Sequence, residues 1–185
     1  MVERVARQLV RDGAPRGRVR AQAEDASAPL TQAVVDQLLD DLVAGLGSPK
    51  RVLLLPPDAT RAHSGAGDLS VALFKRLSPT AEVKLLPALG THEAMSSSEL
   101  DSMFPGIPHD RFLVHDFRNA VSTLGEVPAS FISHISDAKL DYAVPCQVAR
   151  EIKEGGWDRV ISIGQLVPHE VIGIANHAKN VFVGT

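Results

Sequence analysis

The protein has 185 residues, of which 44% are hydrophobic and 22% are charged, and its formal net charge is −3. This profile is that of a globular domain that buries its own core, and the slight acidity gives no electrostatic reason to expect nucleic acid or an anionic membrane as a partner. A single cysteine, Cys146, excludes an internal disulfide, and without a membrane-length apolar run or a secretory signal we expect a cytoplasmic protein with no membrane partner.

Residues 1–28 are predicted to be an arm of uncertain structure, and residues 29–185 an α/β domain. Apolar residues recur at helical spacing over 31–48, with Thr31 as a candidate N-cap and Gly45 and Gly47 as stop signals. The run "RVLLL", which ends at Pro56 and Pro57, predicts a strand buried on both faces.

Further elements alternate along the chain. We predict helices over 67–78, from Ser96 (in a capping box with Glu99) to a point before Pro105, over 128–136 and around 149–156. Strands are predicted over 81–87, 111–116, 140–145, 158–168 and 180–185. The alternation favours βαβ units, and therefore an α/β fold with a mainly parallel sheet and flanking helices, Rossmann-like.

Polar side chains follow several of the predicted strands. In an open α/β sheet, ligands bind beyond the carboxyl ends of the strands, so the fold would bring these groups together. Each residue alone has an ordinary interpretation as a turn, a cap or a surface charge. The groups are Asp58, Thr60 and Arg61; Gly90, Thr91 and His92; His115, Asp116 and Arg118; and His169, His177 and Lys179.

Common short motifs do not account for this pattern. The chain lacks a G-x-G-x-x-G turn, a P-loop, an H-E-x-x-H pair and a G-x-S-x-G elbow. The histidines lack the i, i+4 spacing of a helical zinc site, although ligands from separate loops remain possible.

The ordered segments "PDATR", "GTHEAM", "HDFRNAVSTLGEVP", "LDYAVPCQVAREI" and "SIGQLVPHEVIGIANHAKNVFVGT" resemble the N-terminal half of the lactate racemase family, two-domain enzymes that use a nickel-pincer nucleotide. The resemblance implies racemisation or epimerisation of a 2-hydroxy acid by proton-coupled hydride transfer. It implies that Lys179 tethers the cofactor covalently and that His92 and His169 are the catalytic acid and base. Asp58 and Thr60 would line the cofactor site, and Arg61 would bind the substrate carboxylate or a cofactor phosphate.

Histidine suits acid–base catalysis because its ordinary pKa lies near working pH, and an arginine fork matches a planar carboxylate. The chain departs from the family at Ala59, where a histidine is usual, and in "IANHAK", where a serine and paired glycines are usual. These departures imply a different cofactor seating or substrate.

The family's nickel-ligating histidine and its C-terminal domain would follow Thr185, so the resemblance implies that this domain is a partner and that the 185 residues alone are inactive. Two alternatives remain open. One is a zinc-dependent hydrolase or lyase that uses His92, His169 and His115. The other is a noncatalytic binding domain that kept the pocket and lost cofactor loading.

Overall fold

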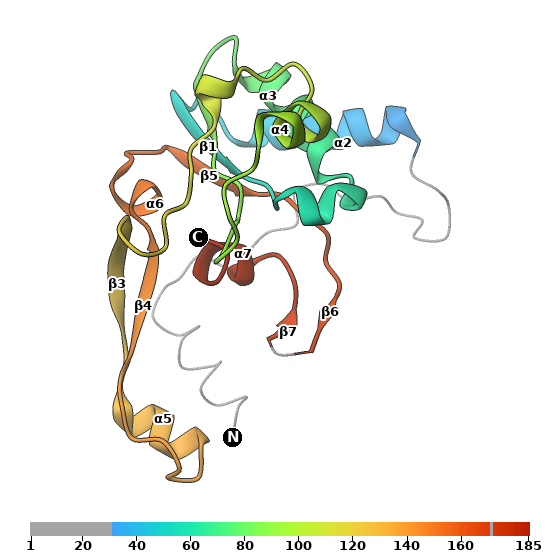
Figure 1. Ribbon diagram of the computed structural model, residues 1–185. Helices are drawn as coiled ribbons and strands as arrows, with labels where there is room; N and C mark the ends of the chain where they lie inside the picture. Colours follow the sequence, from blue (N-terminus) through green and yellow to red (C-terminus); the bar gives the residue numbers. More distant parts are fainter. Residues whose placement is uncertain (1–30, 171) are drawn as a thin grey trace. The chain divides into compact units, whose positions relative to one another are not determined.

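The computed structural model describes residues 31–170 and 172–185 (Figure 1). The predicted arm over 1–28 lies outside these residues. The chain divides into two units, residues 1–45 and 46–185. In the first unit, α2 (Gln32–Gly45) begins after Thr31, whose side-chain oxygen accepts a hydrogen bond from the backbone N–H of Val34. The predicted N-cap and the stop at Gly45 are therefore confirmed.

The second unit holds the elements that carry the polar clusters. Its helices are η1 (Ala59–Ser64), α3 (Ala66–Leu77), α4 (Ser97–Met103), η2 (His109–Arg111), α5 (Ala129–Ile135), α6 (Arg150–Glu154) and α7 (Ala178–Phe182). Its strands are β1 (Arg51–Leu55), β2 (Glu82–Leu85), β3 (Val121–Val127), β4 (Val144–Ala149), β5 (Arg159–Ser162), β6 (Pro168–His169) and β7 (Gly173–Ile174).

A three-stranded parallel sheet in the order β2-β1-β5 forms the centre of this unit. Val52 pairs with Val83 on one side and with Arg159 on the other. All four apolar residues of β1 after Arg51 are fully buried, as the uninterrupted run "VLLL" predicts for a strand covered on both faces. The predicted α/β fold with a parallel sheet and flanking helices is confirmed.

One face of β1 packs against the later part of the chain. Leu53 and Leu55 belong to a buried cluster with Leu86 and Ala149, and Val181 of α7 packs on it. Because side chains alternate along a strand, Val52 and Leu54 point to the opposite face.

Helix α4, which follows β2 in the chain, carries the predicted capping box. In it, the Ser96 and Glu99 side chains each bond the other residue's backbone N–H.

Two predicted strands are wrong. Over 111–116 the pairing is limited to a bridge between Phe112 and Leu85, and Val114 is 62% exposed, so this segment is not a buried strand. Residues 180–185 contain the end of helix α7 in place of a strand. A short apolar run does not by itself distinguish a strand from one turn of helix, which explains the second error.

The structure also contains two antiparallel pairs that the sequence did not predict. β3 and β4 form a ribbon with α5 between them in the chain (Figure 1), and β6 and β7 form a short hairpin before α7. β4 begins where the predicted strand over 140–145 was to end. Among residues 31–170 and 172–185, no helix has the length and apolar character needed to cross a bilayer.

Candidate active site

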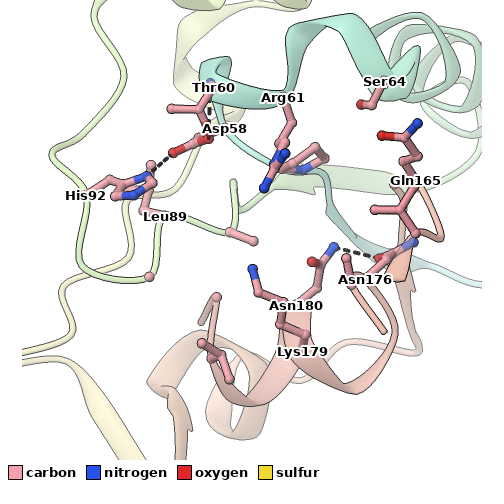
Figure 2. Close-up of a pocket in the computed structure, with 18 of the residues that line it drawn as sticks. Asp58, Thr60, Arg61, Ser64, Leu89, His92, Gln165, Asn176, Lys179 and Asn180 are labelled. Carbon is pink, nitrogen blue, oxygen red and sulfur yellow. Dashed lines mark hydrogen bonds and ion pairs between the residues drawn. The ribbon is translucent and has the colours of Figure 1, made fainter. Parts of the chain in front are cut away.

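The carboxyl ends of β1, β2 and β5 supply the walls of one cavity of about 270 Å³ (Figure 2). Asp58, Thr60 and Arg61 come from the segment after β1, and Thr91 and His92 from the segment after β2. The chain after β5 contributes a third wall. Its lining residues are Gly164, Gln165, Val167, Ala175, Asn176, Lys179, Asn180, Val183 and Gly184.

The wall after β1 is shaped by local sequence. Pro56 and Pro57 end the strand because proline offers no N–H to a ladder. Asp58 then caps η1, and its Oδ1 atom accepts a hydrogen bond from the Thr60 backbone N–H at 3.2 Å and another from the Thr60 hydroxyl. The cap holds Arg61 in the first turn of η1, where its side chain enters the cavity (Figure 2).

The wall after β2 packs closely on the end of α7. Gly90 donates its backbone N–H to the carbonyl of Gly184 at 2.9 Å, and a Cβ at Gly90 would lie 3.3 Å from the carbonyl oxygen of Val183. Gly90 also has a φ of 58°, which favours glycine. The chain turns immediately afterwards, where the His92 N–H bonds the Leu89 carbonyl at 2.9 Å, and this turn places the His92 side chain beside Asp58.

Asp58 and His92 form the polar pair of the site. The Nδ1 atom of His92 lies 2.5 Å from Oδ2 of Asp58, whose side chain is 8% exposed against 59% for His92. Burial by itself raises the pKa of Asp58, but hydrogen bonds from His92 and Thr60 and the charge of His92 together hold that pKa below its ordinary value. Asp58 is therefore ionised at neutral pH and can only accept hydrogen bonds.

Two cations face this pair. Arg61 and Lys179 point into the cavity from opposite walls (Figure 2), and within residues 31–170 and 172–185 neither side chain is engaged by a carboxylate. Arginine and lysine without an acidic partner form a cavity suited to an anionic ligand, such as a carboxylate or a phosphate.

His169 does not line this cavity. It is the last residue of β6, and its Nδ1 atom lies 3.7 Å from a carboxylate oxygen of the adjacent Glu170. The structure therefore gathers Asp58, Thr60, Arg61, His92 and Lys179 at one site and places His169 on the hairpin that precedes α7.

The predicted cluster around His115 also lies apart from the cavity. His115 is 7% exposed, and burial lowers its pKa, with partial opposition from the charge of Asp116. Asp116 caps a turn by accepting the backbone N–H groups of Arg118 and Asn119. In the part of the chain that the structure describes, no group of three or more histidine, cysteine, aspartate or glutamate side chains could hold a metal ion.

The sequence interpretation missed two cavity residues, Asn176 and Asn180. They lie four positions apart and flank Lys179, and their side chains are hydrogen-bonded to each other. Two carboxamides at that spacing beside a candidate functional lysine are a signal that the sequence alone offered.

No protein-family model and no curated protein sequence matches the chain. Among solved structures, a protein from Thermotoga maritima determined by a structural genomics consortium is 31% identical with a TM-score of 0.74, and the match covers 84% of this chain and 38% of that one.

A second solved structure carries a functional name. The lactate racemase apoprotein from Thermoanaerobacterium thermosaccharolyticum is 22% identical with a TM-score of 0.58, and the match covers 79% of this chain and 32% of that one. The chain therefore has the α/β fold of the N-terminal domain of lactate racemase. It spans 38% and 32% of the lengths of the two proteins.

Proposed function

We propose that this chain is the part of a nickel-pincer-dependent racemase or epimerase that binds the cofactor and moves the substrate proton, with a 2-hydroxy acid as substrate. The observation that carries the proposal is the meeting of Lys179, Arg61 and the Asp58–His92 pair in one cavity, from three separate strand ends. The likeness in fold to lactate racemase supports the reaction class.

The residues of the cavity fit the cofactor. The Lys179 amine can form a covalent bond to an acyl or thioacyl group, and it faces the cavity free of an acidic partner among the described residues. Thr60 and Arg61 lie across from it, where a cation suits an anionic group. When bound, the cofactor would supply a carbon that accepts and returns a hydride beside nickel.

His92 is the proposed acid–base group. Because ionised Asp58 accepts a hydrogen bond from Nδ1, neutral His92 must carry its proton on Nδ1 and present a lone pair on Nε2. The exposed position of the ring leaves Nε2 open to the substrate hydroxyl, whose proton it would take and return. Asp58 would then act through His92 by fixing the ring and its tautomer.

Arg61 is the residue that we propose binds the substrate carboxylate. Its guanidinium offers paired N–H donors that match the two oxygens of a carboxylate, so it would fix one end of the hydroxy acid while His92 contacts the hydroxyl.

Inversion at C2 also requires a proton-transfer group for the opposite face of the substrate. His169 stays the predicted group for that role, although it lies on the hairpin before α7 and outside the cavity lining. We propose in addition that a second domain completes the site and supplies a nickel-ligating histidine, so that the 185 residues alone turn over no 2-hydroxy acid.

The decisive experiment is peptide mass spectrometry of the protein in its full-length form, expressed with nickel and a cofactor-making pathway. We expect a pincer-sized adduct on the Lys179 peptide. The Lys179→Arg variant, which keeps the charge but cannot form the same bond, is the matched control and should carry no adduct. An unmodified Lys179, in a preparation where a known nickel-pincer enzyme is loaded, would contradict the proposal and favour a noncatalytic binding domain.

A further inference from the structure

The short helix that carries Lys179 depends on contacts with the rest of the domain for its stability. α7 spans only Ala178–Phe182, and a helix of that length is not stable without tertiary contacts. Val181 supplies an apolar contact with the core cluster. What fixes the opposite, cavity-facing side of the helix is a group of polar side chains: Ser162, Asn176 and Asn180.

Asn180 is the centre of this group. Its side-chain nitrogen donates to Oδ1 of Asn176 at 2.7 Å, to the Ser162 hydroxyl at 3.2 Å and to the Ile163 carbonyl at 3.4 Å. The Ser162 hydroxyl in turn donates to the same Asn176 oxygen at 2.8 Å. Asn180 is 7% exposed, so these bonds are shielded from competing water.

The group connects Lys179 to the central sheet. Ser162 is the last residue of β5 and pairs with Leu55 of β1. Asn176 accepts the backbone N–H of Lys179 at 3.0 Å through its own carbonyl. Lys179 is therefore linked to the end of β5 both through its neighbour Asn180 and through the backbone of Asn176.

The fit around Asn176 is close. A Cβ at Gly164 would lie 3.2 to 3.3 Å from three atoms of the Asn176 carboxamide, which is tighter than ordinary side-chain contact. Asn176 also has a φ of 63°, a conformation that costs energy for a residue with a side chain but which asparagine tolerates better than most. Backbone and side chain together therefore place the Asn176 oxygen between its two donors.

We propose that Asn180, acting with Asn176 and Ser162, is the positioning residue that keeps the Lys179 amine in the cavity. The importance of Lys179 rests on the proposed function, whereas the positioning is a claim about geometry that can be tested without the cofactor.

The hydrogen bonds are asymmetric, and this gives a matched pair of variants. Asn180 uses its nitrogen, so Asn180→Asp removes both N–H donors and sets a carboxylate against two oxygens that cannot donate, those of Asn176 and Ile163. Asn176 uses its side-chain oxygen, so Asn176→Asp keeps an acceptor for both donors. The two substitutions add the same charge near Lys179, but only Asn180→Asp should disrupt the hydrogen bonds among the three side chains.

The test is trace acetylation of lysines by N-acetoxysuccinimide in the cofactor-free full chain, read by mass spectrometry. Exposed Lys75 is the internal reference for half-buried Lys179. We expect Asn180→Asp to raise the Lys179 to Lys75 labelling ratio by about fivefold, the equivalent of one lost hydrogen bond, and Asn176→Asp to leave the ratio near its wild-type value. Labelling of Lys84, whose amine donates to the Asp110 carbonyl, should stay constant. This control distinguishes a local displacement of α7 from partial unfolding of the whole domain.

An unchanged ratio in Asn180→Asp, or an equal rise in both variants, would overturn the proposal, since the second result would mean that loss of the Asn180 N–H donors is not what releases Lys179. If Asn180→Asp does not fold by circular dichroism, Ser162→Ala carries the test: it removes one donor and one acceptor and should raise the ratio by a smaller factor. A missing adduct on Lys179 would contradict the proposed function and leave this labelling pattern as it is.

Discussion

The Nδ1 atom of His92 and the Oδ2 atom of Asp58 lie 2.5 Å apart, although 34 positions separate the two residues in the chain. The bond joins the segments that follow two adjacent parallel strands, β1 and β2. It fixes which nitrogen of His92 carries a proton, and so it determines which nitrogen can serve as a base.

The first prediction concerns this tautomer. In the neutral form of His92, ¹⁵N chemical shifts of the imidazole should show the proton on Nδ1, because ionised Asp58 accepts from that atom. In Asp58→Asn the carboxamide can also donate, the preference weakens, and kcat of the loaded enzyme should fall by about 10²-fold or more. A wild-type His92 with its proton on Nε2 would contradict the proposed role of Asp58.

The second prediction concerns stability in acid. The pKa of Asp58 is held below its ordinary value, so its ionised form stabilises the folded protein above the ordinary pKa of aspartate, near 4, and that stabilisation is lost as the pH falls through the folded pKa. Urea unfolding should therefore show the wild type more stable than Asp58→Asn at pH 6, with the difference shrinking toward pH 3. A difference that does not change over this range would show that the carboxylate charge is not the cause.

The third prediction concerns Arg61. Arg61→Lys keeps the charge but loses the paired donors, so in the loaded enzyme KM for a 2-hydroxy acid should rise by about tenfold, with a smaller change in kcat. Arg118→Lys is the control, because Arg118 stacks over Phe117 away from the cavity. A loss confined to kcat would place Arg61 in the chemical step and not in carboxylate binding.

The fourth prediction concerns packing between α3 and α4. A Cβ at Gly67 would overlap the carbonyl oxygen of Met103, so Gly67→Ala should lower the free energy of unfolding by about 1–3 kcal/mol. Gly125 has open space around it and serves as the matched glycine, for which the change to alanine should stay within about 0.5 kcal/mol. Equal effects of the two substitutions in urea unfolding would contradict the close approach.

The fifth prediction concerns the turn before Lys179. His177 has φ 50° and ψ −129°, a combination that glycine adopts readily and other residues avoid. His177→Gly should therefore be more stable than His177→Ala by about 1 kcal/mol, the reverse of the usual order of these residues. The ordinary order, with alanine the more stable, would mean that the turn carries no strain.

The parts of the fold that were predicted correctly have strong local signals. "RVLLL" before two prolines, the Ser96–Glu99 capping box and the apolar spacing of α2 and α3 each specify an element by themselves. The β3–β4 ribbon has no such signal, because most of its residues are exposed or half-buried and its sequence lacks the apolar alternation of a covered strand. Its pairing is a tertiary contact that no short window contains.

The cavity was predictable to a similar extent. The sequence placed Asp58, Arg61, His92 and Lys179 after strands, and parallel strands bring such positions to one edge of the sheet. The direction of a short hairpin is not encoded in that rule, and for this reason the position of His169 on β6 could not be inferred. Asn180 was missed because the interpretation sought charged groups, whereas its contribution is a buried carboxamide.

The sheet order β2-β1-β5 has a consequence for the way the protein is made. The Asp158 carboxylate that accepts the Arg51 backbone N–H lies 107 positions further along the chain, directly before β5. During synthesis, β2 is the first strand that can pair with β1. The other edge of β1 stays unpaired until β5 has been synthesised. Such distant pairing slows folding, and the segment that bears Lys179 emerges later still. Among the described elements, the wall that bears Lys179 is therefore the last part of the pocket to form, and a nascent chain can bind a ligand there only after β5 has paired with β1.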